Sequence, residues 1–143
     1  MSKRHENPSG LSPVSLAFVG DSVFELMVRE RLVNRGGMPA GKLHRMSVQR
    51  VRAAAQALAY DAVLAACSEQ ELRILKRGRN VSLSRMPKNC TPQEYHKATA
   101  IETLFGYLYL SGEHERLEWM FEIIDAQIAR EEEKSQDGGN SQV

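Results

Sequence analysis

The chain has 143 residues, 42% of them apolar and 26% charged, and a formal net charge of +1. This length suits one domain with its own core, and the apolar share excludes a disordered or fibrous chain. No apolar run approaches the roughly 18 residues of a membrane span, and the N-terminal stretch MSKRHENPSG has no apolar segment of a secretory signal. The two cysteines belong to no CxxC or Cys/His cluster. These features indicate a cytoplasmic protein without a membrane segment, disulfide or zinc site.

The first predicted helix begins at Ser12 and Pro13, an N-cap followed by proline at the first helical position. It is apolar almost all round, which is typical of a helix in the centre of a domain. The sequence NRGGMP, residues 34–39, ends it. A second helical stretch runs over 43–67 and contains a possible break near Val51.

Two capping boxes predict further helix starts, because a Ser or Thr and the acid three residues later satisfy each other's backbone N–H groups. They are Ser68 with Glu71 and Thr91 with Glu94. The helices that remain are expected at 69–78, 92–110 and 113–132. With no evident strand or repeat, the prediction is an all-α fold of about five to seven helices. It forms a single domain at 11–133, between a flexible arm at 1–10 and a disordered polar tail at 134–143.

Charge is distributed unevenly along the chain. Residues 29–97 contain fourteen Lys or Arg against five Asp or Glu, a balance of +9, whereas residues 98–143 have a balance of −7. A basic segment of this kind indicates a surface that faces a polyanion. An ordinary solvated surface with unevenly placed charges is the alternative.

The basic segment contains a loop, KRGRNVSLSRMPKNC (76–90), with no acidic residue. Its glycine and asparagines favour tight turns, in which backbone N–H groups and cations bind phosphate together. No Walker spacing is present, so a mononucleotide site is not expected. A solvated loop without a ligand is the alternative.

Three carboxylates stand in apolar or small-residue surroundings. Asp21 and Glu25 lie four residues apart in LAFVGDSVFELMV, on one side of the first helix, and Glu102 lies in TAIETLFGYLYL. Burial of an ionised carboxylate costs several kcal/mol unless it is paired or bound to a cation. Together these acids could hold a hard divalent cation such as Mg²⁺, and separately each could pair with an arginine.

Gly20 and Gly106 stand close to these acids in the sequence. Glycine inside a helix costs about 1 kcal/mol relative to alanine, so it usually has a packing reason. We therefore expect the two helices to touch at these glycines and to bring Asp21 and Glu102 together.

FVGDSVFE and TAIETLFGYLYL resemble the carboxylate-bearing helices of the ribonuclease III catalytic domain, and the resemblance covers roughly residues 11–130. LKRGRN and PKN in the basic loop are similar to the short Mini-ribonuclease III branch, so no double-stranded-RNA-binding domain is expected. The resemblance implies an all-helical, homodimeric endonuclease that cleaves double-stranded RNA with Mg²⁺. The implied substrate is the precursor of large-subunit (23S) ribosomal RNA.

The same resemblance makes Asp21 and Glu102 the catalytic metal ligands. Two further carboxylates of full-length ribonuclease III are replaced here by Ala17 and Thr99. We therefore expect one Mg²⁺ per site rather than a tightly held pair. Glu25 is expected either to support the site or to pair with an arginine across the dimer.

RNA contacts are expected from the basic loop and from the segment before it. The candidates are Lys76, Arg77, Arg79, Asn80, Arg85, Lys88, Asn89, Lys42, His44 and Arg45, with Arg50 and His96 as further ones. Two other classes of protein stay open. A non-catalytic double-stranded-RNA-binding or ribosome-assembly module would use the same loop and have purely structural acids, and Mg²⁺-dependent cleavage separates it from the enzyme. A helical protein–protein adaptor would leave the basic segment without a role.

Overall fold

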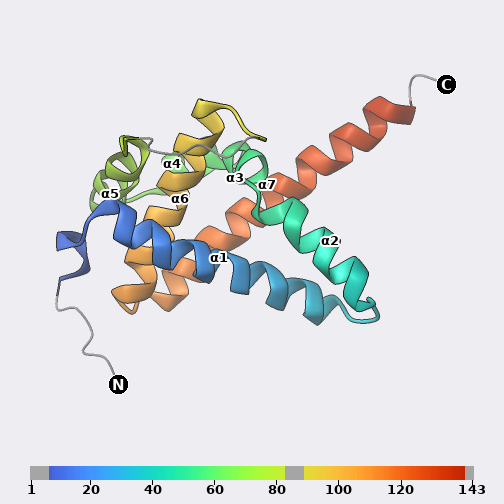
Figure 1. The fold of residues 1–143 in the computed structure, drawn as a ribbon, viewed down its shortest axis with the longest axis horizontal. Helices are drawn as coiled ribbons and strands as arrows, with labels where there is room; N and C mark the ends of the chain where they lie inside the picture. Colours follow the sequence, from blue (N-terminus) through green and yellow to red (C-terminus); the bar gives the residue numbers. More distant parts are fainter. Residues whose placement is uncertain (1–6, 83–88, 141–143) are drawn as a thin grey trace.

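The chain folds into seven α-helices and one 3-10 helix in the computed structural model, which describes residues 7–82 and 89–140 (Figure 1). In chain order the elements are η1 (Pro8–Gly10), α1 (Pro13–Arg35), α2 (Ala40–Val51), α3 (Ala53–Leu58), α4 (Tyr60–Ala66), α5 (Glu69–Arg79), α6 (Pro92–Leu110) and α7 (His114–Asn140). No strand occurs in the described residues, so the predicted all-α class and helix number are confirmed. Within the same residues, no helix combines the length and apolarity that crossing a membrane requires.

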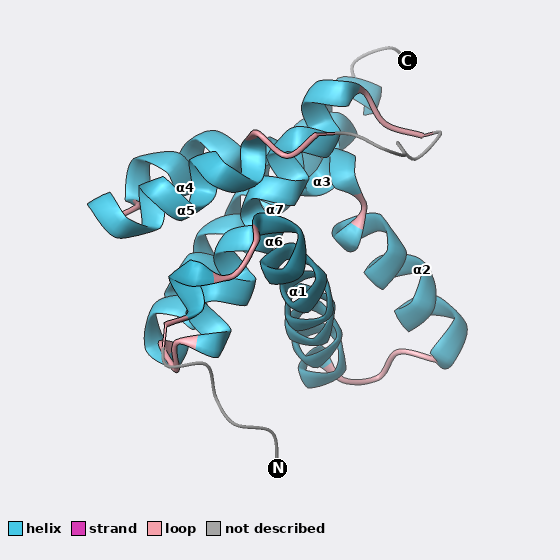
Figure 2. Cartoon of the chain, turned by 60° about the vertical axis from the view of Figure 1, so that its left-hand side comes forward, coloured by secondary structure: helices cyan, strands magenta, loops and turns pink. Residues whose placement is uncertain are grey.

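The core is built around α1 and α6, which pack together through the middle of the molecule (Figure 2). Phe24 of α1 contacts Phe105 of α6 and Phe121 of α7 edge to face, with ring centroids 5.5 and 5.8 Å apart. All three rings are buried. Helices α3 and α5 pack against α6, and α2 packs against α1. Side chains at the contact between α1 and α6 are therefore positioned by the most extensively packed part of the fold.

The helix boundaries follow from the capping residues that the sequence contains. Ser12 accepts a hydrogen bond from the backbone N–H of Ser15, and both predicted capping boxes form. The helical stretch predicted over 43–67 is interrupted at Arg52, whose backbone is extended (φ −64°, ψ 152°). The break predicted near Val51 is thus confirmed, and it separates α2 from α3.

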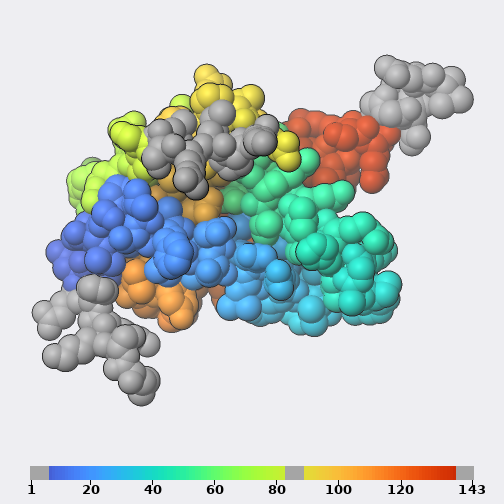
Figure 3. Space-filling view, viewed as in Figure 1, coloured from blue at the N-terminus to red at the C-terminus, as the bar shows by residue number. Residues whose placement is uncertain are grey.

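Helix α1 is central to the domain, as its apolar pattern predicts, but it is not buried on every side. Leu16 and Phe24 are buried in the core, whereas Phe18 and Leu26 are 82% and 64% exposed. Figure 3 shows the surface of α1 (blue) directly beside the end of α6 and the start of α7 (orange). The apolar residues of α1 therefore form two faces. One packs in the core, and the other is exposed on the surface of this chain.

The described part of the expected N-terminal arm is attached to the domain. Residues Pro8–Gly10 form η1, and Pro8 is buried. Arg77 of α5 donates hydrogen bonds to the carbonyl oxygens of Ser9 (2.8 Å) and Leu11 (3.0 Å). Residues 8–10 are therefore not the flexible arm that we expected, because α5 holds them, while residues 1–6 lie outside the described residues.

The last helix continues beyond its predicted end at Glu132 and into the segment expected to be disordered. It runs to Asn140 and extends past the other helices (Figure 1). Its exposed polar residues are compatible with a helix in water, and Lys134 lies 3.6 Å from Glu131, an i,i+3 pair that supports the helix.

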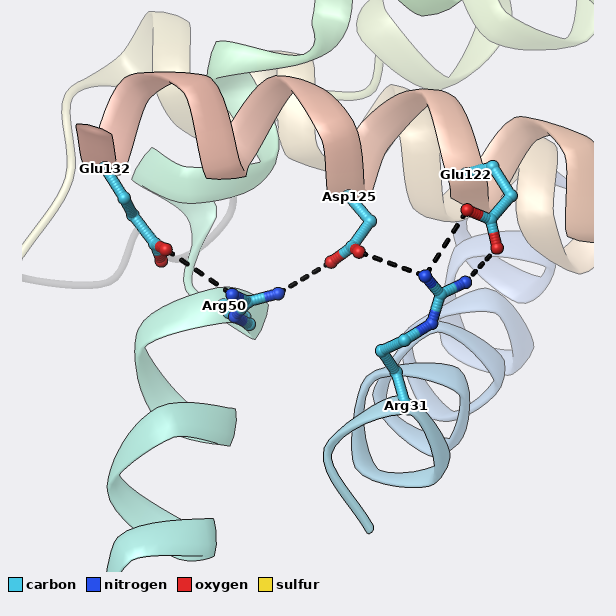
Figure 4. Close-up of polar contacts among 5 residues, drawn as sticks. All are labelled: Arg31, Arg50, Glu122, Asp125 and Glu132. Atoms are coloured by element: carbon cyan, nitrogen blue, oxygen red, sulfur yellow. Dashed lines mark hydrogen bonds and ion pairs between the residues drawn. The ribbon is translucent and has the colours of Figure 1, made fainter. Parts of the chain in front are cut away.

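A row of ion pairs connects α7 to α1 and α2 (Figure 4). Arg50 of α2, which is 5% exposed, binds Asp125 (2.6 Å) and Glu132 (3.4 Å). Arg31 of α1 binds Asp125 (3.3 Å) and Glu122. Arg50 therefore does not line an RNA groove as expected, because its guanidinium is buried between helices. Part of the charge asymmetry along the sequence is internal pairing between the basic middle and the acidic last helix.

Candidate functional site

The candidate site lies where α1 and α6 make direct backbone contact. A Cβ atom added to Gly20 would lie 2.6 Å from the carbonyl carbon of Glu102, and one added to Gly106 would lie 2.7 Å from the carbonyl carbon of Leu16. Real Cβ atoms do not approach other atoms so closely, so only glycine fits at both positions. The helix contact predicted from the two glycines is confirmed.

This contact brings the side chains of Asp21 and Glu102 together. Burial, and then the negative charge of Asp21, raise the pKa of Glu102 to about 8. A hydrogen bond from the Gln56 amide acts in the opposite direction on the same pKa. Among the described residues, no Lys, Arg or His forms a salt bridge with either carboxylate. A carboxylate pair of this kind favours either a shared proton or a bound cation.

Gln56 of α3 is the residue that the sequence analysis missed. It is only 1% exposed, and its Nε2 donates a hydrogen bond to the carbonyl oxygen of Val51 (2.7 Å). Its other amide atom, Oε1, is buried and has no hydrogen-bond partner in the described part of the chain. The one sequence feature that could have indicated a role for Gln56 is that it is the single amide residue inside the apolar run AAAQALAY.

The donor set at this site suits a hard divalent cation. Mg²⁺ binds oxygen ligands, typically one or two carboxylates completed by waters and substrate phosphates. Asp21 and Glu102 supply two carboxylates, and the buried Oε1 of Gln56 is a further oxygen that lacks a partner. No three His, Cys, Asp or Glu side chains in the described ranges are grouped closely enough to hold a metal by themselves. The residues present therefore fit a cation with few protein ligands.

The structure does not bring Glu25 to the acid pair. Its carboxylate lies 2.8 Å from the guanidinium of Arg29, one turn further along α1. Glu25 is also not among the groups that shift the pKa of Glu102. Glu25 is therefore not positioned as the supporting acid that we expected, because it pairs with an arginine on the same helix.

Polar groups without partners gather where α5 meets the start of α6. Arg79, Asn80, Gln93 and His96 line a polar pocket of about 350 Å³. Nη1 of Arg79 and Nδ1 of His96 are buried atoms that have no hydrogen-bond partner among residues 7–82 and 89–140. The Arg79 guanidinium also lies over the ring of Tyr60, 5.1 Å from its centroid. This pocket can accept an anion.

The remaining predicted RNA contacts fall into separate groups. Lys76 and Asn89 are exposed, and both are close in sequence to residues that line this pocket. Arg77 instead donates a hydrogen bond to the backbone around η1. Arg85 and Lys88 lie outside the described residues. The three candidates on α2, namely Lys42, His44 and Arg45, are exposed. Helix α5 lies near the start of α1 and helix α2 near its end (Figure 1), so the described candidates on these two helices belong to separate parts of the surface.

Comparison with known proteins identifies the class to which this fold and site belong. The Ribonuclease III domain profile matches residues 14–113. The chain therefore belongs to the ribonuclease III family, within its Mini-ribonuclease 3 branch, and is an endoribonuclease.

Individual relatives support this assignment over most of the chain. The Mini-ribonuclease 3 of Symbiobacterium thermophilum is 44% identical over 114 residues, which are 80% of this chain and 88% of the relative. That of Clostridium tetani is 37% identical over 132 residues, 92% and 85% of the two chains. A crystal structure of a protein from Fusobacterium nucleatum superposes with a TM-score of 0.75 at 30% identity, covering 82% of this chain and 93% of that one.

Proposed function

We propose that this chain is a Mg²⁺-dependent endoribonuclease that cleaves double-stranded RNA, with Asp21 and Glu102 as the residues that hold the cation. The observation that carries the proposal is the carboxylate pair at the contact between α1 and α6, which has no cationic partner in the described residues. When bound, Mg²⁺ supplies a water of lowered pKa and neutralises charge on the scissile phosphate.

The chain's own residues prepare this site. Gly20 and Gly106 allow the two backbones to touch, which fixes the distance between the carboxylates. The surrounding core limits the access of water to Glu102, so the attraction between its carboxylate and a cation is stronger than at an exposed position. Preorganisation of this kind is needed for charge that develops at a phosphate during hydrolysis.

Duplex RNA is the substrate that the polar surface fits. An A-form duplex is recognised largely through its phosphates and 2′-hydroxyls rather than its base sequence. Nη1 of Arg79 and Nδ1 of His96, which have no partner among the described residues, and the exposed cations of α2 are suitable for such contacts. The resemblance to Mini-ribonuclease III makes the precursor of 23S ribosomal RNA, in the cytoplasm, the expected substrate.

The exposed apolar face of α1 supports a homodimer. Phe18 and Leu26, together with Tyr109 and Leu117, line an apolar groove of about 470 Å³. Exposed apolar patches of this kind mark association sites, and a second copy on a two-fold axis would cover the same patch on both chains. Phe18→Asp is expected to shift the chain from dimer to monomer in light scattering. An unchanged mass would exclude this face as the dimer contact.

The test of the proposed function is cleavage of a long RNA duplex with and without Mg²⁺. The wild-type chain is compared with Asp21→Asn and Glu102→Gln, which keep the side-chain shape and remove the charge. We expect discrete double-strand cuts only for the wild type with Mg²⁺, and a loss of more than about 100-fold in rate for either variant. Intact RNA that is nevertheless shifted on a native gel would overturn the proposal in favour of a binding module.

A further inference from the structure

The buried side chain of Gln56 lies beside the acid pair, and its Oε1 has no hydrogen-bond partner among the described residues. It comes from α3, a third helix that packs against α6. It is 1% exposed, and its amide interacts with the carboxylate of Glu102. Three helices therefore each bring one oxygen-bearing side chain to this place, namely Asp21 from α1, Gln56 from α3 and Glu102 from α6.

The orientation of the Gln56 amide is determined by its neighbour. Nε2 donates to the carbonyl oxygen of Val51 at 2.7 Å. The opposite orientation would place two oxygen atoms against each other, so Nε2 must face Val51. Oε1 is then left as a buried acceptor without a partner. Buried polar atoms are nearly always hydrogen-bonded, and an exception calls for an explanation such as a bound water, a bound ion or a catalytic role.

A divalent cation is the ligand that this oxygen fits. Two carboxylates provide only part of the octahedral oxygen shell that Mg²⁺ requires, and amide oxygens belong to the hard donors that such cations accept. A hydrogen-bond donor on a neighbouring side chain would equally satisfy Oε1, but none in the described residues does so.

We propose that Gln56 is the third protein group of the cation site, with its amide oxygen contributing to the oxygen shell of the cation at Asp21 and Glu102. Its Nε2 meanwhile holds the end of α2 through the carbonyl of Val51. This inference rests on the proposed function, since it adds a residue to the same cation site.

The first test measures Mg²⁺ affinity by calorimetry on the whole chain without RNA. Gln56→Met keeps the length of the side chain and removes the amide, and Gln49→Met, at an exposed position of α2, is the matched control. We expect binding about 10- to 100-fold weaker for Gln56→Met and unchanged for Gln49→Met. If Gln56 is only structural, Gln56→Met lowers the melting temperature of the metal-free chain and leaves Mg²⁺ affinity unchanged, which overturns the inference.

A second measurement needs no substitution at Gln56. The side-chain carbonyl and amide resonances of Gln56 are followed by NMR in the wild-type chain during a Mg²⁺ titration, with Asp21→Asn as the control. We expect a shift in the wild type that is lost in the control. If Mg²⁺ binds the wild type and these resonances do not move, Gln56 is not part of the site, although the acid pair is. If Mg²⁺ does not bind the wild type, the cation site itself is excluded, and this inference with it.

Discussion

Two glutamates of this chain experience opposite electrostatic surroundings. Glu71 of α5 is buried, yet its pKa is lowered, because two hydrogen bonds from Arg116 (both 2.8 Å) and the capping contact with Ser68 outweigh the effect of burial. Glu102 of α6 has no arginine partner among the described residues, and its pKa is raised to about 8 by burial and by the charge of Asp21.

The difference separates an acid used for structure from an acid available for chemistry. Where an acid serves to hold helices together, the chain provides an arginine, as it does for Glu71 and again for Asp125 between Arg31 and Arg50. At the contact between α1 and α6 the chain provides a second carboxylate instead. Two neighbouring carboxylates repel each other unless a proton or a cation lies between them, so this arrangement is expected of a cation site.

The largest loss of stability is expected when a side chain fills the close contact between α1 and α6 that brings the two acids together. Gly20→Ala places a Cβ against the backbone of Glu102, so helix α1 must move away from α6. We expect a loss of about 4 kcal/mol or more in the free energy of unfolding, measured with denaturant. Gly41→Ala in α2 is the control, because its Cβ would have only an ordinary contact with Arg45. Equal stability of the two variants would contradict the close packing described for α1 and α6.

Removal of the Arg116 guanidinium beside Glu71 should leave Glu71, like Glu102, as a buried carboxylate without an arginine partner. Arg116→Met leaves the buried carboxylate of Glu71 unpaired and is expected to cost about 3 kcal/mol in unfolding free energy. Arg73→Met is the control, because Arg73 is exposed and, among the described residues, its side chain binds only Gln70. RNA cleavage per folded molecule should be unchanged in both. A loss of cleavage in folded Arg116→Met would show that the two acid sites are not independent.

The pH dependence of stability should have opposite signs at the two glutamates. The raised pKa of Glu102 means that the folded, metal-free chain binds this proton more tightly than the unfolded chain, so its contribution declines as the pH rises from about 4.5 to about 8. The lowered pKa of Glu71 stabilises the fold above about pH 4.5, and this contribution is lost as the pH falls through the folded-state pKa.

Thermal melts over this pH range without metal are the measurement. Burial is the larger cause of the raised pKa of Glu102 and remains in Asp21→Asn, whereas the charge of Asp21 is removed. We therefore expect a smaller decline between pH 4.5 and 8 in this variant, a change of on the order of 2 kcal/mol. Mg²⁺ should flatten it in the wild type as well, because the cation competes with the proton. A decline that is identical in wild type and Asp21→Asn would contradict the coupling of the two carboxylates.

The sequence predicts the elements whose cause is local and misses those that depend on distant partners. The caps at Ser68 and Thr91, and the acids beside Gly20 and Gly106, can be interpreted from spacing of a few residues. The pairing of Arg50 with Asp125 joins residues 75 positions apart, which no local pattern contains.

Gln56 and the exposed side of α1 are two further features that the sequence does not predict. A lone glutamine among alanines has the same sequence pattern whether it lies in water or against a buried carboxylate, and only the packing of α3 on α6 decides between them. Likewise, the apolar residues of α1 do not reveal which of them pack in the core and which, like Phe18, reach the surface.

The smallest effect is expected at Glu25, whose sequence position four residues after Asp21 made it a candidate for the site. Its i,i+4 pair with Arg29 is exposed, so Glu25→Gln should cost only about 0.3–0.5 kcal/mol in unfolding free energy. Because Arg29 already neutralises this carboxylate, Mg²⁺ affinity and cleavage rate should stay at the wild-type level. Calorimetry and cleavage assays on Glu25→Gln beside Asp21→Asn measure this directly. A loss of Mg²⁺ affinity in Glu25→Gln comparable to that in Asp21→Asn would mean that Glu25 leaves Arg29 when the cation binds.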